Sequence, residues 1–171
     1  AATGDVNEIR YMRSNRDLQI FTLSDELYIP TYLNQAITPT NAQIRKQTPF
    51  GSEFVLPTSI DGATIFVERG GRAVREYIYS DAEDAYISTG ISTVASHLIV
   101  NPVDIAVVHS GFSTQESYAA LVMGNGDMAF FSSNRAEKRA AWTKVTTQGD
   151  YLAAASIGDR LFYYAKDVNN N

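Results

Sequence analysis

The stretch that decides the fold is Thr64–Ser80, TIFVERGGRAVREYIYS, in which two runs of β-branched and aromatic residues flank Gly70-Gly71. Glycine supplies the positive φ that a two-residue type I′ turn needs at both central positions, so the pattern predicts an antiparallel hairpin. In the resulting register, Phe66 is opposite Arg75. One face then carries Ile65, Val67, Val74 and Ile78, and the other carries Phe66, Tyr77 and Tyr79.

Both faces of the predicted hairpin are apolar, whereas a hairpin with one wet face alternates apolar and polar residues. We therefore expect other parts of the protein to cover both faces.

The hairpin also carries three arginines. Arg69 opposes Arg72 at the tip. Arg75 has Glu68 on a diagonal and Phe66 directly opposite, so it has two candidate partners. The simpler interpretation is that these charges only keep a hairpin soluble, because surface ion pairs are worth little.

The rest of the chain predicts mostly short strands. Residues 80–90 are polar and predict a loop. Within 91–100 a helical spacing of apolar residues predicts a short helix, with Ile91, Val94, Ala95 and Leu98 on one face. The remaining segments with strand character are 8–14, 18–24, 27–30, 42–48, 54–60, 103–110, 116–123, 128–133, 141–147, 151–157 and 160–166.

Groups of four strands repeat along the chain, because first strands begin near residues 8, 54, 103 and 151, at spacings of 46, 49 and 48 residues. A four-stranded repeat of this length is typical of β-propeller blades, which stack because a small sheet cannot bury its own faces. The sequence predicts an all-β fold, a partial propeller over residues 1–171. Its blades are expected at 8–48, 54–100, 103–147 and, as a half-blade, 151–167. A β-sandwich is the alternative.

The half-blade predicts a partner. Propellers close with four to eight blades, so an open arc leaves apolar faces and strand edges uncovered. We expect the arc to be completed by the rest of the polypeptide or by neighbouring subunits. The chain begins at Ala1 without a methionine or a signal-peptide pattern, which is consistent with a piece of a longer protein.

Composition narrows the classes of function. The 171 residues include no cysteine, which excludes disulfides and thiolate chemistry. The net charge is −5 and no basic stripe is present, which argues against tight nucleic-acid binding. The sequence has no apolar run long enough to span a membrane.

Few residues are candidates for chemistry. His97 and His109 lack metal-ligand spacing, and the acidic cluster Asp81, Glu83 and Asp84 lacks the calcium-loop pattern. The sequence therefore predicts no catalytic residue, no metal site and no cofactor. The alternative is a propeller-type carbohydrate-active enzyme that uses the acids at 81–84, since paired glycosidase carboxylates are set by spatial separation.

Four motifs follow one another in the first half of the chain. They are the pair VNEIR (6–10) and LQIF (18–21), the pair ITPTN (37–41) and IRKQT (44–48), then FVERGGRAVREY (66–77), and then DAYI (84–87). In this order they resemble the tail nozzle proteins (tail tubular protein B) of short-tailed bacteriophages and related prophage tail proteins. The similarity covers residues 6–96 well and the remainder loosely. Members of that family are larger, so the resemblance implies a fragment.

The resemblance implies a non-enzymatic structural protein of the virion tail, assembled in the host cytoplasm. It implies a hexameric ring that contacts other tail proteins such as the adaptor and lets double-stranded DNA pass during ejection. Arg69, Arg72 and Arg75 match the family motif and are the expected binding residues, with hairpin packing as the alternative role. An acidic wall is compatible with sliding DNA. A propeller acting as a protein-interaction scaffold is the remaining alternative.

Overall fold

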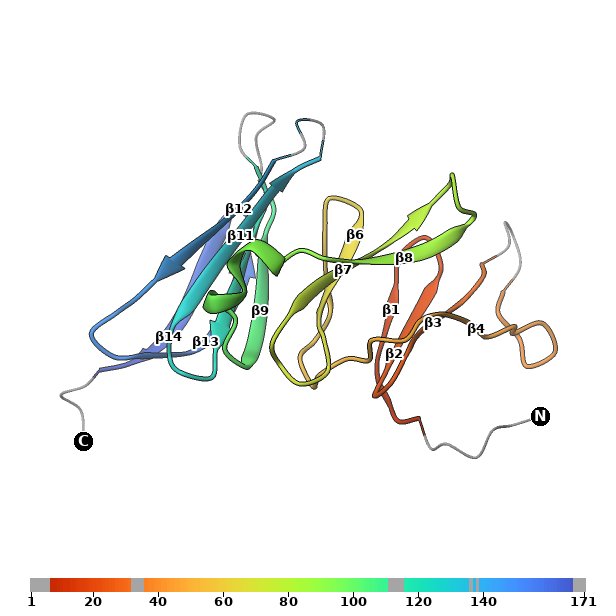
Figure 1. Ribbon diagram of the computed structural model, residues 1–171, viewed down its shortest axis with the longest axis horizontal. Coiled ribbons are helices and arrows are strands. Elements are labelled where there is room, and N and C mark those ends of the chain that lie inside the picture. The colour runs from red at the N-terminus through yellow and green to blue at the C-terminus, as the bar shows by residue number, and fades with distance from the viewer. Residues whose placement is uncertain (1–6, 32–35, 111–115, 136, 138, 168–171) are drawn as a thin grey trace.

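The computed structural model describes residues 7–31, 36–110, 116–135, 137 and 139–167. Within these residues the protein is all-β, as predicted, with antiparallel sheets of which none closes into a barrel. In Figure 1 the N-terminal strands lie at one end of the long axis of the molecule, and the C-terminal hairpin overlaps the strands that precede it at the other end.

The sheets are meanders, because the spatial order of the strands is the order along the chain. Sheet 1 contains β1 (Ile9–Ser14), β2 (Leu18–Thr22), β3 (Glu26–Ile29) and β4 (Arg45–Thr48). Sheet 2 contains β5 (Thr58–Ile60), β6 (Ala63–Val67), β7 (Val74–Ser80) and β8 (Ala85–Gly90). The 3-10 helix η1 (Thr93–Leu98) leads to sheet 3, with β9 (Pro102–Val108), β10 (Tyr118–Met123), β11 (Met128–Asn134) and β12 (Arg139–Val145). Sheet 4 has two strands, β13 (Asp150–Ile157) and β14 (Arg160–Lys166).

Apolar side chains pack each sheet against the next. An aromatic cluster joins sheets 1 and 2, an aliphatic cluster joins sheets 2 and 3, and a smaller cluster joins sheets 3 and 4. Their central members are Phe21, Tyr28, Phe66, Tyr77 and Tyr86; then Ile65, Val67, Val74, Leu121 and Phe131; then Ala120, Val122, Met128 and Tyr151. Burial of one such large side chain contributes about 1.5–3 kcal/mol, so these clusters supply most of the hydrophobic stabilisation.

The β6–β7 hairpin is covered on both faces, which confirms the expectation from its apolar pattern. Phe66 and Tyr77 are fully buried against sheet 1, and Ile65 and Val67 are fully buried against sheet 3. Phe66 is opposite Arg75, in the predicted register. Figure 1 shows this hairpin in the middle of the molecule, between the two flanking sheets.

The tip of this hairpin differs from the prediction. Both glycines have positive φ, but the Gly71 amide donates to the Glu68 carbonyl, so Arg69 and Gly70 are the central residues of the closing turn. Arg69 does not extend the ladder toward Arg72, because its amide donates instead to the Gly51 carbonyl. The segment between β4 and β5 therefore takes the hydrogen bond that Arg69 would otherwise donate within the hairpin. Turn preferences of the local sequence do not predict this contact.

The predicted type I′ geometry occurs one turn earlier. Asp61 and Gly62, which lie between β5 and β6, have φ values of 48° and 81°. They join the paired residues Ile60 and Ala63, so both central positions of a two-residue turn are left-handed, as type I′ requires.

Three further predictions were wrong in detail. Residues 80–90 are not all loop, because Ala85–Gly90 form β8 and the turn is confined to residues 81–84. The strand expected at 54–60 pairs only over Thr58–Ile60, after Pro57, which cannot donate a ladder hydrogen bond. The expected helix is a kinked 3-10 segment in which Ala95 is buried but Val94 is 86% exposed, so the helical spacing of apolar residues marked a buried face only in part.

Candidate functional site

The three arginines proposed as binding residues occupy two different environments. Arg69 and Arg72 are exposed at the tip of the β6–β7 hairpin. Arg75 lies on β7 with only 15% of its side chain exposed. The structure therefore brings Arg69 and Arg72 to the surface and places Arg75 between packed elements.

Arg75 is held on several sides. Its Nη1 donates to Glu68 Oε2 at 2.9 Å, its Nε donates to Ser88 Oγ at 2.9 Å, and its Nη2 donates to the Ser88 carbonyl at 3.1 Å. Its guanidinium carbon lies 3.3 Å from the centroid of the Phe50 ring, whereas the hairpin register predicts Phe66 as the aromatic partner. These contacts tie β6, β7, β8 and the segment after β4 together, which is a packing role.

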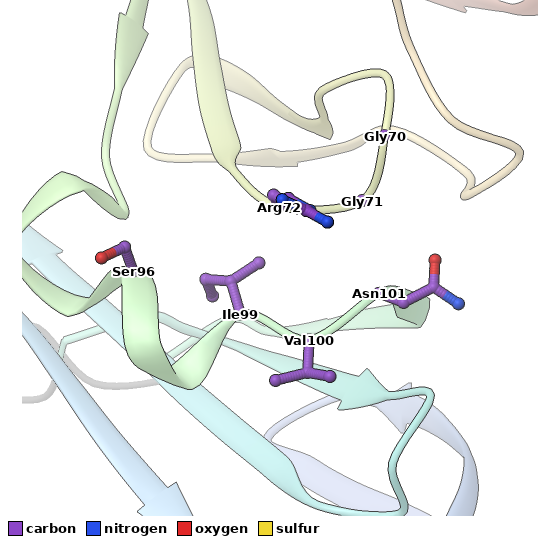
Figure 2. Close-up of a pocket in the computed structure, with 7 residues that line it drawn as sticks. All are labelled: Gly70, Gly71, Arg72, Ser96, Ile99, Val100 and Asn101. Atoms are coloured by element: carbon purple, nitrogen blue, oxygen red, sulfur yellow. The ribbon is translucent and has the colours of Figure 1, made fainter.

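A hollow of about 530 Å³ lies beside the hairpin tip, between the tip and the segment that links η1 to β9. Figure 2 shows Arg72 above it and Ser96, Ile99 and Val100 on its other side. The lining residues are Gly70, Gly71, Arg72, Ser96, Ile99, Val100 and Asn101. The two sides are joined because the Asn101 amide donates to the Gly71 carbonyl at 2.9 Å.

The lining of this hollow combines polar and apolar groups. Its lining carries one cation, Arg72, with the hydroxyl of Ser96 and the amide of Asn101 around apolar Ile99 and Val100. None of its seven lining residues is a histidine or an acid, so the Ser96 hydroxyl has no general base among them. The lining therefore offers one positive charge and two neutral polar groups beside apolar side chains.

The acidic cluster after β7 is held by neighbouring side chains. Asp81 forms an ion pair with Arg16 at 3.1 Å, and the Tyr79 hydroxyl donates to Asp84. The Arg16 guanidinium also lies over the Tyr79 ring. His97 and His109 are exposed on separate segments, and the described part of the chain holds no group of three His, Asp or Glu side chains arranged for a metal ion.

Sequence reasoning missed a buried polar group between sheets 1 and 2. Thr64 donates to the Gln19 side-chain oxygen at 2.6 Å, and the Tyr86 hydroxyl donates to Asp17 at 3.0 Å. Glu26 is fully buried and accepts from the Thr48 hydroxyl. Strand alternation was the available signal, because Gln19 and Glu26 share the inward face of their strands with Phe21 and Tyr28.

Burial governs the ionisation of this group. Burial raises the pKa of the Glu26 carboxyl, and hydrogen bonds from Thr48 and from the Phe50 amide oppose that shift only in part. Burial likewise raises the pKa of Tyr77, and it raises the pKa of Tyr86 to about 12. Glu26 Oε1 and the Tyr77 hydroxyl have no hydrogen-bond partner in the part of the chain that the structure describes.

We expect Glu26→Gln to change the pH dependence of stability. A carboxyl whose pKa is higher in the folded state than in the unfolded state stabilises the fold below its unfolded pKa, and this contribution is lost as the pH rises. The amide stays neutral, so the variant should gain about 1 kcal/mol relative to the parent between about pH 4 and about pH 8. Urea melts at the two pH values measure this difference. Glu83→Gln, at an exposed position, is the control, and equal pH profiles for the parent and Glu26→Gln would contradict the expectation.

Comparison with known proteins assigns no family. The chain matches no protein-family model, and a search of the curated proteins finds no relative. None of the helices in the described residues is long and apolar enough to cross a membrane.

Proposed function

We propose that this chain is a section of a bacteriophage tail nozzle, a structural virion protein without catalytic activity. The observation that supports the proposal best is the serial stacking of three four-stranded meanders through apolar faces, followed by a sheet of two strands. This arrangement is compatible with propeller-like blades at 8–48, 54–100 and 103–147 and a half-blade at 151–167. The phage assignment itself rests on the order of the four sequence motifs.

In this proposal the chain contributes to a six-fold ring in the tail. The exposed Arg69 and Arg72 and the hollow beside them offer a surface for a neighbouring subunit or the adaptor, while Arg75 holds the hairpin in shape. A propeller-like enzyme is a weaker candidate, because Asp81 and Asp84 are both engaged by neighbouring side chains.

Electron microscopy of the purified protein tests the ring. We expect rings with six-fold symmetry at concentrations of about 10 µM or more, since subunit association is concentration-dependent. A charge-reversed pair, Arg69→Glu with Arg72→Glu, should reduce the ring population, whereas Arg160→Glu on the last hairpin serves as the control. Monodisperse single particles under all conditions would contradict the ring.

The channel role predicts weak contact with DNA. Because the chain carries a net charge of −5, its surface should bind the negatively charged phosphates of a DNA duplex only weakly. We expect a dissociation constant weaker than about 10⁻⁴ M at physiological salt, the weak limit of non-specific binding. Fluorescence anisotropy with a labelled duplex measures it, and micromolar or tighter binding would contradict the proposed wall.

A further inference from the structure

Among the described residues, sheet 4 ends with an open edge at β14. In sheets 1, 2 and 3 each strand pairs with the strand that follows it, so the next neighbour in sheet 4 would pair with β14. β13 lies against β9 and β10 of sheet 3. β14 has no second neighbour among the described strands, and its central residues LFYYA carry no charge. Natural edge strands are usually protected by charges or proline, so this edge suits strand addition.

The geometry of the turn identifies which groups face outward. Ile157 and Arg160 pair across the two-residue turn Gly158-Asp159. Such a closing pair exchanges hydrogen bonds, and alternation then directs the N–H groups of Leu161 and Tyr163 away from β13. The side chains along this strand are also accessible, since Phe162 is 50% exposed and Tyr164 is 65% exposed.

The complete sheets show what the third and fourth strands supply. In sheet 2 they direct Tyr77 and Tyr86 toward sheet 1, where Tyr86 lies 4.9 Å from the Tyr28 ring. In sheet 3 they supply Phe131 and Trp142, and the Trp142 indole donates to the Ile91 carbonyl. In both cases the outer hairpin of a sheet brings aromatic side chains to the sheet before it.

Sheet 3 has an aromatic surface that no described strand covers, at the position where sheet 1 is covered by the outer hairpin of sheet 2. Tyr118 on β10 and Phe130 on β11 have ring centroids 5.3 Å apart and are half-buried. They line a hollow of about 390 Å³ together with Glu116, Ser132, Ala141 and Thr143. On sheet 1 the corresponding second and third strands carry Phe21 and Tyr28, which are buried beneath the outer hairpin of sheet 2.

We propose that the free edge of β14 and the hollow on sheet 3 bind a two-stranded antiparallel β-hairpin supplied by a polypeptide segment other than residues 1–171. Its first strand extends sheet 4 by main-chain hydrogen bonds, and its aromatic side chains cover Tyr118 and Phe130. The site continues the packed interface between sheets 3 and 4. A second copy of the chain does not supply this hairpin, because every strand described here already belongs to a sheet. The inference rests on the fold and does not require the phage assignment.

The test titrates the full chain with a backbone-cyclised peptide of residues 74–90, the outer hairpin of sheet 2. At a peptide concentration about ten times its dissociation constant, amide exchange at Leu161 and Tyr163 should slow about tenfold. The same peptide with Tyr77→Ser and Tyr86→Ser should protect these amides far less. In the protein, Thr143→Arg should weaken binding about tenfold by filling the hollow, while Thr147→Arg, at an exposed loop position, should not.

Four results would overturn the proposal. Absence of protection would show that β14 accepts no strand. Equal protection by the two peptides, or binding that Thr143→Arg does not affect, would show that the hollow plays no part. Amides already protected in a sedimenting dimer would show that a second copy occupies the edge.

Discussion

Gly51→Ala is expected to lower the free energy of unfolding by about 3 kcal/mol or more, a large part of the stability of a domain. Gly51 has a φ of 74°, a conformation that L side chains rarely adopt. A Cβ atom built there would lie 2.1 Å from the Leu23 carbonyl oxygen. The Gly51 carbonyl also accepts the Arg69 amide, so backbone movement at this position would disturb the tip of the central hairpin. Urea denaturation measures the change.

Gly70→Ala is the matched control. Gly70 has a φ of 94°, but a Cβ there would meet no atom within 4 Å. The control therefore includes the conformational cost of about 1 kcal/mol without the steric clash. If the two alanine variants lose the same stability, the close approach of Gly51 to Leu23 does not constrain the fold.

Arg75→Ala should destabilise the protein by about 2–3 kcal/mol, whereas Arg69→Ala and Arg72→Ala should each cost less than about 0.5 kcal/mol. The first change removes the ion pair to Glu68, two hydrogen bonds to Ser88 and the stacking on Phe50. Thermal melts of the three variants test the difference.

Arg75→Lys separates charge from shape, because an ammonium cannot reproduce the planar, forked contacts of the guanidinium. We expect it to recover less than half of the stability lost in Arg75→Ala. Full recovery by lysine would mean that only the positive charge matters. Equal losses in all three alanine variants would contradict the packing role assigned to Arg75 alone.

The central hairpin shows what local sequence can predict. The position of Gly70-Gly71 predicted the register of Phe66 with Arg75, and the apolar residues on both faces of Thr64–Ser80 predicted that both faces are buried. Both predictions use only residues close together in the chain, because successive side chains of a strand alternate between its two faces. The same reasoning located most strands. It failed at β8, because residues 80–90 are polar as a group and were predicted to form one loop.

The environment of the candidate site residues was harder to predict from the sequence. The pairing of Arg75 with Glu68 was predicted from the hairpin register and is confirmed, whereas the contacts of Arg75 with Phe50 and Ser88 come from other segments and were not predicted. Strand alternation places Glu26 on an inward face, but its complete burial, which raises the pKa of its carboxyl, is visible only in the folded structure. Burial and pairing of this kind depend on which sheets meet, which a local pattern does not contain.

By itself, the sequence determined the all-β class, the strand periodicity, the positive φ at Gly70-Gly71 and the net charge, because each depends on residues near one another in the chain. Tertiary structure alone decided the turn at the tip of the central hairpin, the stacking of Arg75 on Phe50 and the burial of Glu26. The physical reason is that these features depend on segments far apart in the chain. Such segments supply hydrogen-bond partners to backbone groups and exclude water from side chains only once the sheets have packed together.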